Sequence, residues 1–161
     1  MIGPARVALV AVLATGAAAL PAADALAKHA RDGRFSGRTD QRFHGKRGRA
    51  VFTVGHHGQI LKDLKIDLLY DCPKYGQWPS KLVISRTKIQ YHSGIFLRTG
   101  NFTGRAYGGH KAKIEIRMAG RFTRTVTARA QLRALMSVIT PHGVRETCAA
   151  VANFYGARRF G

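Results

Sequence analysis

The chain has 161 residues and a formal net charge of +19, from 27 Lys and Arg against 8 Asp and Glu. This length allows one domain with a buried core. Two cysteines are too few for a cysteine-only zinc site, and so few carboxylates leave little scope for paired acid–base catalysis. A charge of this sign favours polyanionic partners, although it can also serve only to keep an exported domain soluble.

The first 27 residues have the pattern of a secretory signal peptide. A short basic leader at 1–6 precedes an apolar run at 7–20, and Ala25-Leu26-Ala27 fits a small-x-small cleavage site. Cleavage after Ala25 is the alternative. The run is too short to span a bilayer, so we expect a processed, secreted or periplasmic (cell-envelope) protein with no transmembrane segment, rather than an uncleaved anchor. The removed segment holds one basic and one acidic residue, so the charge of +19 is retained.

Residues 28–48 are predicted to be a basic, partly disordered segment that precedes a β domain at 49–161. Within this segment, 34–39 can form a short first strand, which would extend the β domain toward the N-terminus. The arginines and lysines of 40–48 are expected to lie in a mobile basic loop.

Alternation of apolar and polar residues predicts strands at 49–54 and 59–70. Between them, Gly55 and Gly58 flank two histidines and are expected to supply the positive φ angles of a tight turn. The second strand is expected to end at 71–73, because the proline there interrupts ladder pairing.

The middle of the chain is predicted to consist of loops and short strands. Residues 74–81 are expected to be a loop in which Trp78 covers one end of the core, or else offers a stacking platform for a sugar or base. Four short strands and then a Gly-rich loop follow, at 82–84, 88–91, 94–97, 100–102 and 104–110.

The strictest alternation predicts a β-hairpin whose strands, 113–118 and 122–139, are joined through Gly120. The apolar residues of 128–139 also fit a helical stripe. The β-branched residues that precede this stretch favour the strand.

A turn at 140–143 and a last strand at 149–155 bring the count to eight or nine short strands, and no segment is assigned to a helix. Short alternating strands with Gly-rich turns are typical of antiparallel sheets. We therefore expect an all-β fold, a single antiparallel β-sandwich or barrel-like domain after an N-terminal signal peptide.

An exported chain meets an oxidising compartment, so Cys72 and Cys148 are expected to form a disulfide. The bridge would close a loop of 77 residues, counting both cysteines, and contribute about 4 kcal/mol in the chain-entropy model. It would tie a middle strand to the last one. Metal ligation is the alternative, but it needs further ligands, and the sequence has no Cys-x-x-Cys.

Several short motifs follow one another in linear order: Phe35-Ser36-Gly37-Arg38-Thr39, Cys72 after an alternating strand, Gly120-Arg121-Phe122, Cys148 before an aromatic, and Ala157-Arg158. This order resembles an uncharacterised family of small secreted bacterial single-disulfide β-domain proteins. The resemblance implies secretion, a β domain and one disulfide, but no activity and no site residues. The chain departs from the family pattern at Ala149 and at Phe154 or Tyr155, where a Gly and a Trp are expected.

No catalytic signature is present. The sequence lacks Gly-x-Ser-x-Gly and His-Glu-x-x-His, and oxidised cysteines would offer no thiolate. Asp67 and Glu115 alternate outward on predicted strands, and the adjacent His56 and His57 would bind a metal only with ligands from elsewhere. We expect a non-enzymatic protein with no catalytic residue, metal site or cofactor. A hydrolase or metal enzyme with an unrecognised site is the less favoured alternative.

Basic residues that alternate along the predicted hairpin, or lie among aromatics before it, form the one candidate site. If these strands pair, their outer face is a basic stripe that could bind an anionic cell-wall polymer, lipopolysaccharide or nucleic acid. The candidate anion-binding residues are Arg98, Arg105, Arg117, Arg121, Arg124, Arg129 and Arg133. The alternatives are a solvated sheet face without a ligand, and a structural or protein-interaction domain of the cell envelope whose protein partner is unknown.

Overall fold

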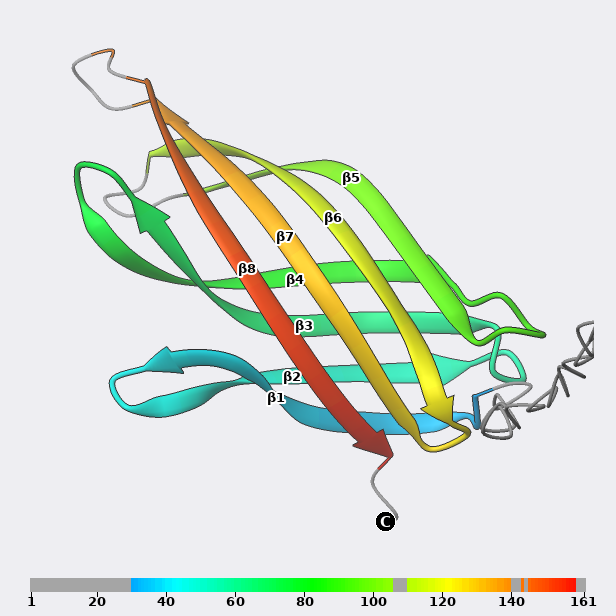
Figure 1. Ribbon diagram of the computed structural model, residues 1–161. Coiled ribbons are helices and arrows are strands. Elements are labelled where there is room, and N and C mark those ends of the chain that lie inside the picture. The colour runs from blue at the N-terminus through cyan, green and yellow to red at the C-terminus, as the bar shows by residue number, and fades with distance from the viewer. Residues whose placement is uncertain (1–29, 106–109, 140–142, 144, 159–161) are drawn as a thin grey trace, which may run out of the picture.

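The computed structural model describes residues 30–105, 110–139, 143 and 145–158, and these form antiparallel strands and no helix (Figure 1). The signal peptide expected at 1–27 lies outside the described residues, as do 106–109 of the expected Gly-rich loop and 140–142 of the expected turn. The strands are β1 (Gly33–Phe43), β2 (Lys46–Gly55), β3 (Ile60–Cys72), β4 (Gly76–Lys88), β5 (Ile95–Arg105), β6 (Lys111–Arg124), β7 (Thr127–Ile139) and β8 (Arg145–Arg158).

The strands form one sheet in the order β4-β3-β2-β1-β8-β7-β6-β5. Strands β5–β8 cross diagonally over β1–β4, so that the sheet folds back on itself in two layers (Figure 1). Its two ends meet where Ile89 bridges Phe96 and the Gln90 N–H donates to the Ile95 carbonyl at 2.8 Å. The predicted all-β, antiparallel, barrel-like domain is therefore confirmed.

The core lies between the two layers, because alternate residues of each strand point inward. Along β6, β7 and β8 buried and exposed positions alternate almost without interruption. Phenylalanines fill one part of the core, where Phe35 stacks on Phe52 at 5.0 Å between ring centroids and Phe122 meets Phe35 edge-on at 5.5 Å. Burying a side chain of this size stabilises the fold by about 1.5–3 kcal/mol.

A disulfide joins the two layers. Cys72 at the end of β3 is bonded to Cys148 on β8, and both cysteines are buried. Beside the disulfide, Asp71 of β3 pairs with Ala149 of β8. The predicted bridge between a middle strand and the last strand is therefore confirmed.

The loop expected at 40–48 is wrong, since β1 continues to Phe43 and β2 begins at Lys46. The alternation was hidden because inward positions here carry Gln41 and Gly48 instead of apolar residues. The Gln41 side chain replaces apolar packing with two hydrogen bonds: its amide donates to the Leu69 carbonyl at 2.9 Å, and its oxygen accepts from the Leu69 N–H at 2.8 Å.

The loop expected at 74–81 is also wrong, because β4 begins at Gly76 and runs unbroken to Lys88. Pro79 lies opposite Leu69 within this strand. Proline is tolerated there because β4 is the last strand of the sheet order and has a free edge. Trp78 is half-buried and packs against the core, which fits the role expected of it as a cover.

The segments expected at 94–97 and 100–102 are one continuous strand, β5. The central hairpin exists, but it turns at Thr125 and Val126 rather than around Gly120. Gly120 serves packing, because a Cβ at this position would overlap the ring of Phe96 and the methyl group of Ala130. Residues 128–139 are strand, as predicted, and not helix.

Candidate anion-binding surface

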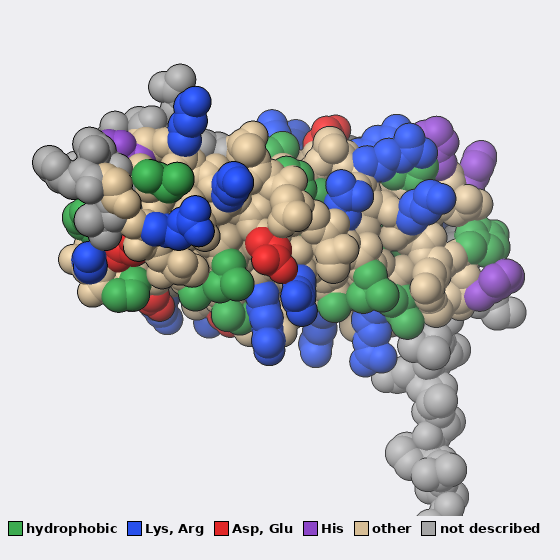
Figure 2. All heavy atoms as spheres, turned by 90° about the horizontal axis from the view of Figure 1, so that it is seen from above, with side chains coloured by type: hydrophobic (Ala, Val, Ile, Leu, Met, Phe, Trp, Pro, Cys, Tyr) green, Lys and Arg blue, Asp and Glu red, His purple; other side chains and the backbone are tan. Residues whose placement is uncertain are grey.

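The outward surface of β5–β8, here named the basic face, carries many more cations than acids. Glu115 is its only carboxylate among the described residues. In Figure 2, Lys and Arg side chains project in a row along one margin of the molecule, whereas acidic side chains are few. The exposed cations of the basic face are Lys111, Lys113, Arg117, Arg121, Arg129, Arg133 and Arg145.

Four arginines of the basic face form like-charge pairs across adjacent strands. Arg117 of β6 lies opposite Arg133 of β7, and Arg121 lies opposite Arg129. Directly opposed residues have Cβ atoms about 4.5–5.5 Å apart, and like charges at that distance destabilise a sheet. Among the described residues, only Arg117 of these four has an ion pair, with Glu115 at 3.4 Å, and this pair is exposed and therefore weak. The sheet thus holds opposed positive charge that internal carboxylates do not neutralise.

The positive charge continues past β7 in a row that crosses five strands, here named the arginine row. Each residue of the arginine row is the cross-strand partner of the next. From β6 to β2, the row consists of Arg121, Arg129, Tyr155, Arg38 and Arg49. With neighbouring strands about 4.8 Å apart, this row is roughly 19 Å long.

A depression of about 490 Å³ lies along the arginine row and includes Arg38, Arg121, Arg129 and Tyr155 in its lining. The guanidinium carbon of Arg129 lies 5.7 Å from the centroid of the Tyr155 ring, which is the geometry of a cation–π contact. Tyr155 remains 46% exposed.

Asp40 is the one acidic side chain in the described lining of this depression. Its carboxylate accepts hydrogen bonds from the backbone N–H of Asn153 at 2.8 Å and from the side-chain amide of Asn153 at 2.6 Å. Asn153 in turn accepts from the Gln131 amide at 3.1 Å. Asp40 therefore keeps its negative charge and is bonded to a neutral partner, and no ion pair joins it to an arginine of the row in the described part of the chain.

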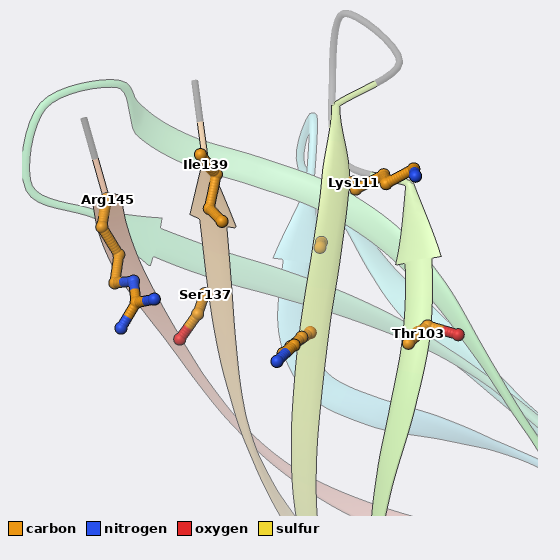
Figure 3. Close-up of a pocket in the computed structure, with 7 residues that line it drawn as sticks. Thr103, Lys111, Ser137, Ile139 and Arg145 are labelled. Atoms are coloured by element: carbon orange, nitrogen blue, oxygen red, sulfur yellow. The ribbon is translucent and has the colours of Figure 1, made fainter. Parts of the chain in front are cut away.

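A second depression, of about 570 Å³, lies at the other end of the basic face. In Figure 3, Arg145 of β8 and Lys111 of β6 flank it, with Ile139 of β7 between them. Lys113 and Ser137 also line this hollow. It is cationic like the first depression, but the described lining has no aromatic residue.

The predicted anion-binding residues do not all share this surface. Arg117, Arg121, Arg129 and Arg133 lie on it, while Arg124 is exposed beyond an irregularity in the β6–β7 pairing. The other two do not join them. Arg98 was a candidate because it lies among aromatic residues, but it has the same inward phase as Phe96, and its Nε is buried without a hydrogen-bond partner in the described part of the chain, so it does not lie on this surface. Arg105 is the last residue of β5, and its side chain lies outside the described residues.

Arg38, Arg49 and Tyr155 were missed by sequence reasoning. Strands β1 and β8 pair although they lie at opposite ends of the described chain, with Arg38 opposite Tyr155. A Cβ at the neighbouring Gly37 would overlap the Tyr155 carbonyl, so this glycine permits the close approach of the two strands. Gly37 and Arg38 belong to a motif that the sequence analysis singled out, but the sequence did not indicate which strand pairs with this segment.

Three carboxylates away from the basic face, Asp32, Asp67 and Glu146, accept hydrogen bonds from backbone groups. Asp67 accepts from the Arg49 N–H at 2.9 Å, and the buried Glu146 accepts from the Lys74 N–H at 2.8 Å. Asp32 accepts from the N–H groups of His57 and Gly58 at 3.1 and 2.7 Å. These bonds fix turns and strand ends.

The expected turn at 55–58 is present, and Gly58 has the positive φ angle expected of it (79°). Gly55 does not, and the other positive φ angles fall on His56 and His57 (both 56°). Within the described residues, no three His, Cys, Asp or Glu side chains gather where they could hold a metal ion. The same residues contain no helix long and apolar enough to cross a membrane.

No protein-family model matches the chain, and a search of curated proteins found no match. The functional argument therefore depends on the geometry of the basic face and the arginine row.

Proposed function

We propose that the protein is an exported, non-enzymatic β domain that binds an anionic polymer or surface through the basic face. The observation that carries this proposal is that two arginine pairs, Arg117 with Arg133 and Arg121 with Arg129, lie directly opposed on a face whose described residues include one carboxylate. An arrangement that costs stability in the free protein is expected where a ligand supplies the missing negative charge.

The energies favour such a ligand. Each opposed like-charge pair costs on the order of 0.2–1 kcal/mol. A hydrogen bond between a guanidinium and an anionic oxygen contributes about 1.5–3 kcal/mol, because both partners are charged. A polyanion that binds several arginines also releases its condensed counterions, which makes the affinity depend on salt.

Export is supported by the disulfide between Cys72 and Cys148, since such bonds persist in oxidising compartments. An exported basic domain meets anionic cell-wall polymers, lipopolysaccharide and released nucleic acid. All three present the phosphate or carboxylate oxygens that arginine binds in a bidentate manner.

The test is retention on an anionic matrix and on isolated cell wall across a salt series. We expect Arg129→Gln/Arg133→Gln to elute at lower salt than the wild type, because two cations of the basic face are removed. For a phosphate ligand, the slope of log K against log salt should fall by roughly 0.9 for each phosphate that is no longer neutralised. Arg34→Gln/Arg86→Gln is the matched control, since both arginines are exposed on β1 and β4, away from the basic face.

Equal shifts for both double variants would contradict the proposal, because binding would then follow net charge and not this face. Circular dichroism of each variant establishes that the fold is intact. A basic protein with only nonspecific affinity, run beside the wild type, sets the elution expected from charge alone.

A second candidate function, a protein-interaction domain, is favoured by exposed aliphatic side chains on the same face. Leu97 is 62% exposed, Leu135 47%, Ile139 52% and Val151 49%. If these residues dock a protein, the Arg129→Gln/Arg133→Gln variant should keep its retention, whereas Leu135→Ser/Val151→Ser should lose the partner.

A further inference from the structure

We infer that the arginine row is a track for a single strand of nucleic acid, which crosses the β-strands and stacks a base on Tyr155. This inference rests on the proposed function and makes it specific in ligand, direction and residues. It includes Arg38 and Arg49, which lie on β1 and β2 and outside the basic face.

The spacing of charges in the row suits a chain that runs across the strands. Arg121 and Arg129 are neighbours on one side of Tyr155, and Arg38 and Arg49 are neighbours on the other side. The centres of these two pairs are three strand spacings apart, or roughly 14 Å measured along the curved sheet. Each pair presents two guanidinium groups, whose planar donors match phosphate oxygens. A flexible backbone can therefore contact one pair, pass Tyr155 and contact the other.

Tyr155 gives the row a feature that charge alone does not provide. It is the only aromatic residue among the outward-facing described residues of β5–β8, and it lies at the centre of the row. Proteins that bind single strands combine a cationic track for the backbone with aromatic rings on which bases stack. The half-exposed Tyr155 ring, with the Arg129 guanidinium 5.7 Å from its centroid, provides such a platform. Bases of a duplex are already stacked and paired, so the single strand is the form that this arrangement fits.

Two carboxylates lie beside this track and keep their negative charge, but the four arginines of the row outnumber them. Asp40 accepts hydrogen bonds from Asn153, and Asp67 accepts from the Arg49 backbone N–H. The second depression, near Lys113 and Arg145, carries similar charge without an aromatic residue in its described lining. It therefore serves as an internal control for attraction by charge alone.

The experiment measures binding by fluorescence anisotropy at fixed salt with three labelled probes. They are oligothymidylate, an abasic oligonucleotide of the same length and charge, and anionic phospholipid vesicles. The row variant Arg38→Gln/Arg49→Gln is compared with Lys113→Gln/Arg145→Gln, which removes the same charge from the basic face outside the row. Tyr155→Leu removes the ring, and Tyr155→Phe retains it.

We expect the row variant to bind oligothymidylate at least tenfold more weakly than the wild type, and the Lys113→Gln/Arg145→Gln control to bind less than threefold more weakly. Tyr155→Leu should weaken oligothymidylate binding by roughly five- to a hundredfold, the range for removal of one base–aromatic stack, and should leave abasic binding unchanged. Tyr155→Phe should bind both oligonucleotides as the wild type does.

Equal affinity for the oligothymidylate and abasic probes would overturn the stacking inference and indicate a base-free phosphodiester polymer. Preference for the vesicles would overturn it in favour of a lipid surface. If Arg129→Gln/Arg133→Gln weakens binding but Arg38→Gln/Arg49→Gln does not, the arginine row is not the binding track, while the proposed function of the basic face stands. If the wild type binds no probe better than a nonspecific basic protein and is also not retained on cell wall, both proposals fail.

Discussion

At the scale of single residues, Tyr70 shows what burial does to a titratable group. Its side chain is 1% exposed, and its hydroxyl has no hydrogen-bond partner in the described part of the chain. Desolvation by burial raises the pKa of Tyr70 from 10.0 to about 12, because the phenolate would lose its hydration. The fold therefore favours the neutral form of the Tyr70 side chain.

This shift predicts a loss of stability in alkali. The unfolded tyrosine ionises near pH 10 and the folded one near pH 12, so the contribution of Tyr70 is complete below pH 10 and is lost as pH rises through 12. The loss should reach about 3 kcal/mol of unfolding free energy. Tyr70→Phe should lack this component, which urea unfolding curves between pH 9 and 12 would measure. Tyr75→Phe, at a position that is 62% exposed, is the control and should follow the wild type.

Arg98 shows how far residue-level reasoning from sequence can go. The sequence showed basic residues among aromatics, and this pattern placed Arg98 among the candidate ligands of an anion. The spacing already contained the correction, because Phe96, Arg98 and Phe102 share one phase of the strand and Phe96 is fully buried. Residue type suggested an exposed cation, whereas the phase of the strand places the Arg98 side chain on the same inward side as Phe96.

At the scale of elements, the pairing of β6 with β7 places Arg121 opposite Arg129. We predict that Arg121→Glu stabilises the protein by about 0.5–1 kcal/mol at low salt, because it replaces a like-charge pair with an opposite-charge pair. The same change should weaken retention on an anionic matrix. Thermal unfolding at low and high salt would measure the gain, which should shrink as salt screens the pair. A variant that is less stable than the wild type at low salt would show that the two guanidinium groups do not repel each other.

The strands themselves were largely predictable from sequence, but their boundaries were not. Alternation is strong where inward positions are apolar, as along 128–139, and this stretch was assigned correctly. It fails where an inward position is filled by a hydrogen-bonding side chain such as Gln41, or where a strand contains Pro79 at a sheet edge. Gly120 was misread as a turn because a glycine that makes room for the Phe96 ring looks the same in sequence as one that bends the chain.

At the scale of the whole molecule, the Cys72–Cys148 bond ties the two layers together. We predict that Cys72→Ala/Cys148→Ala lowers the free energy of unfolding by about 2–4 kcal/mol, mainly because the unfolded chain is no longer constrained. Urea denaturation of the variant and of the oxidised wild type would measure the difference. Equal midpoints with equal slopes would contradict the prediction.

The arrangement of the strands in space explains what sequence could not provide for the candidate site. The hairpin arginines were found because their strands follow one another in the chain. Arg38 and Arg49 were not, since they join the arginine row only through the β1–β8 pairing. That pairing depends on the register of strands more than a hundred residues apart, for example Phe35 opposite Arg158. A single sequence does not reveal such a register.

The β1–β8 pairing also bears on how the chain can fold. Strands β1–β4 and β5–β8 each pair with their neighbours in sequence, so each group can assemble through short-range hairpins. The sheet is completed only when β8 reaches β1, after the longest loop closure in the fold. Until then, the edge of β1 is open to pairing with other chains. Because Cys148 lies on β8, its bond to Cys72 also helps to hold in place the strand that covers the edge of β1.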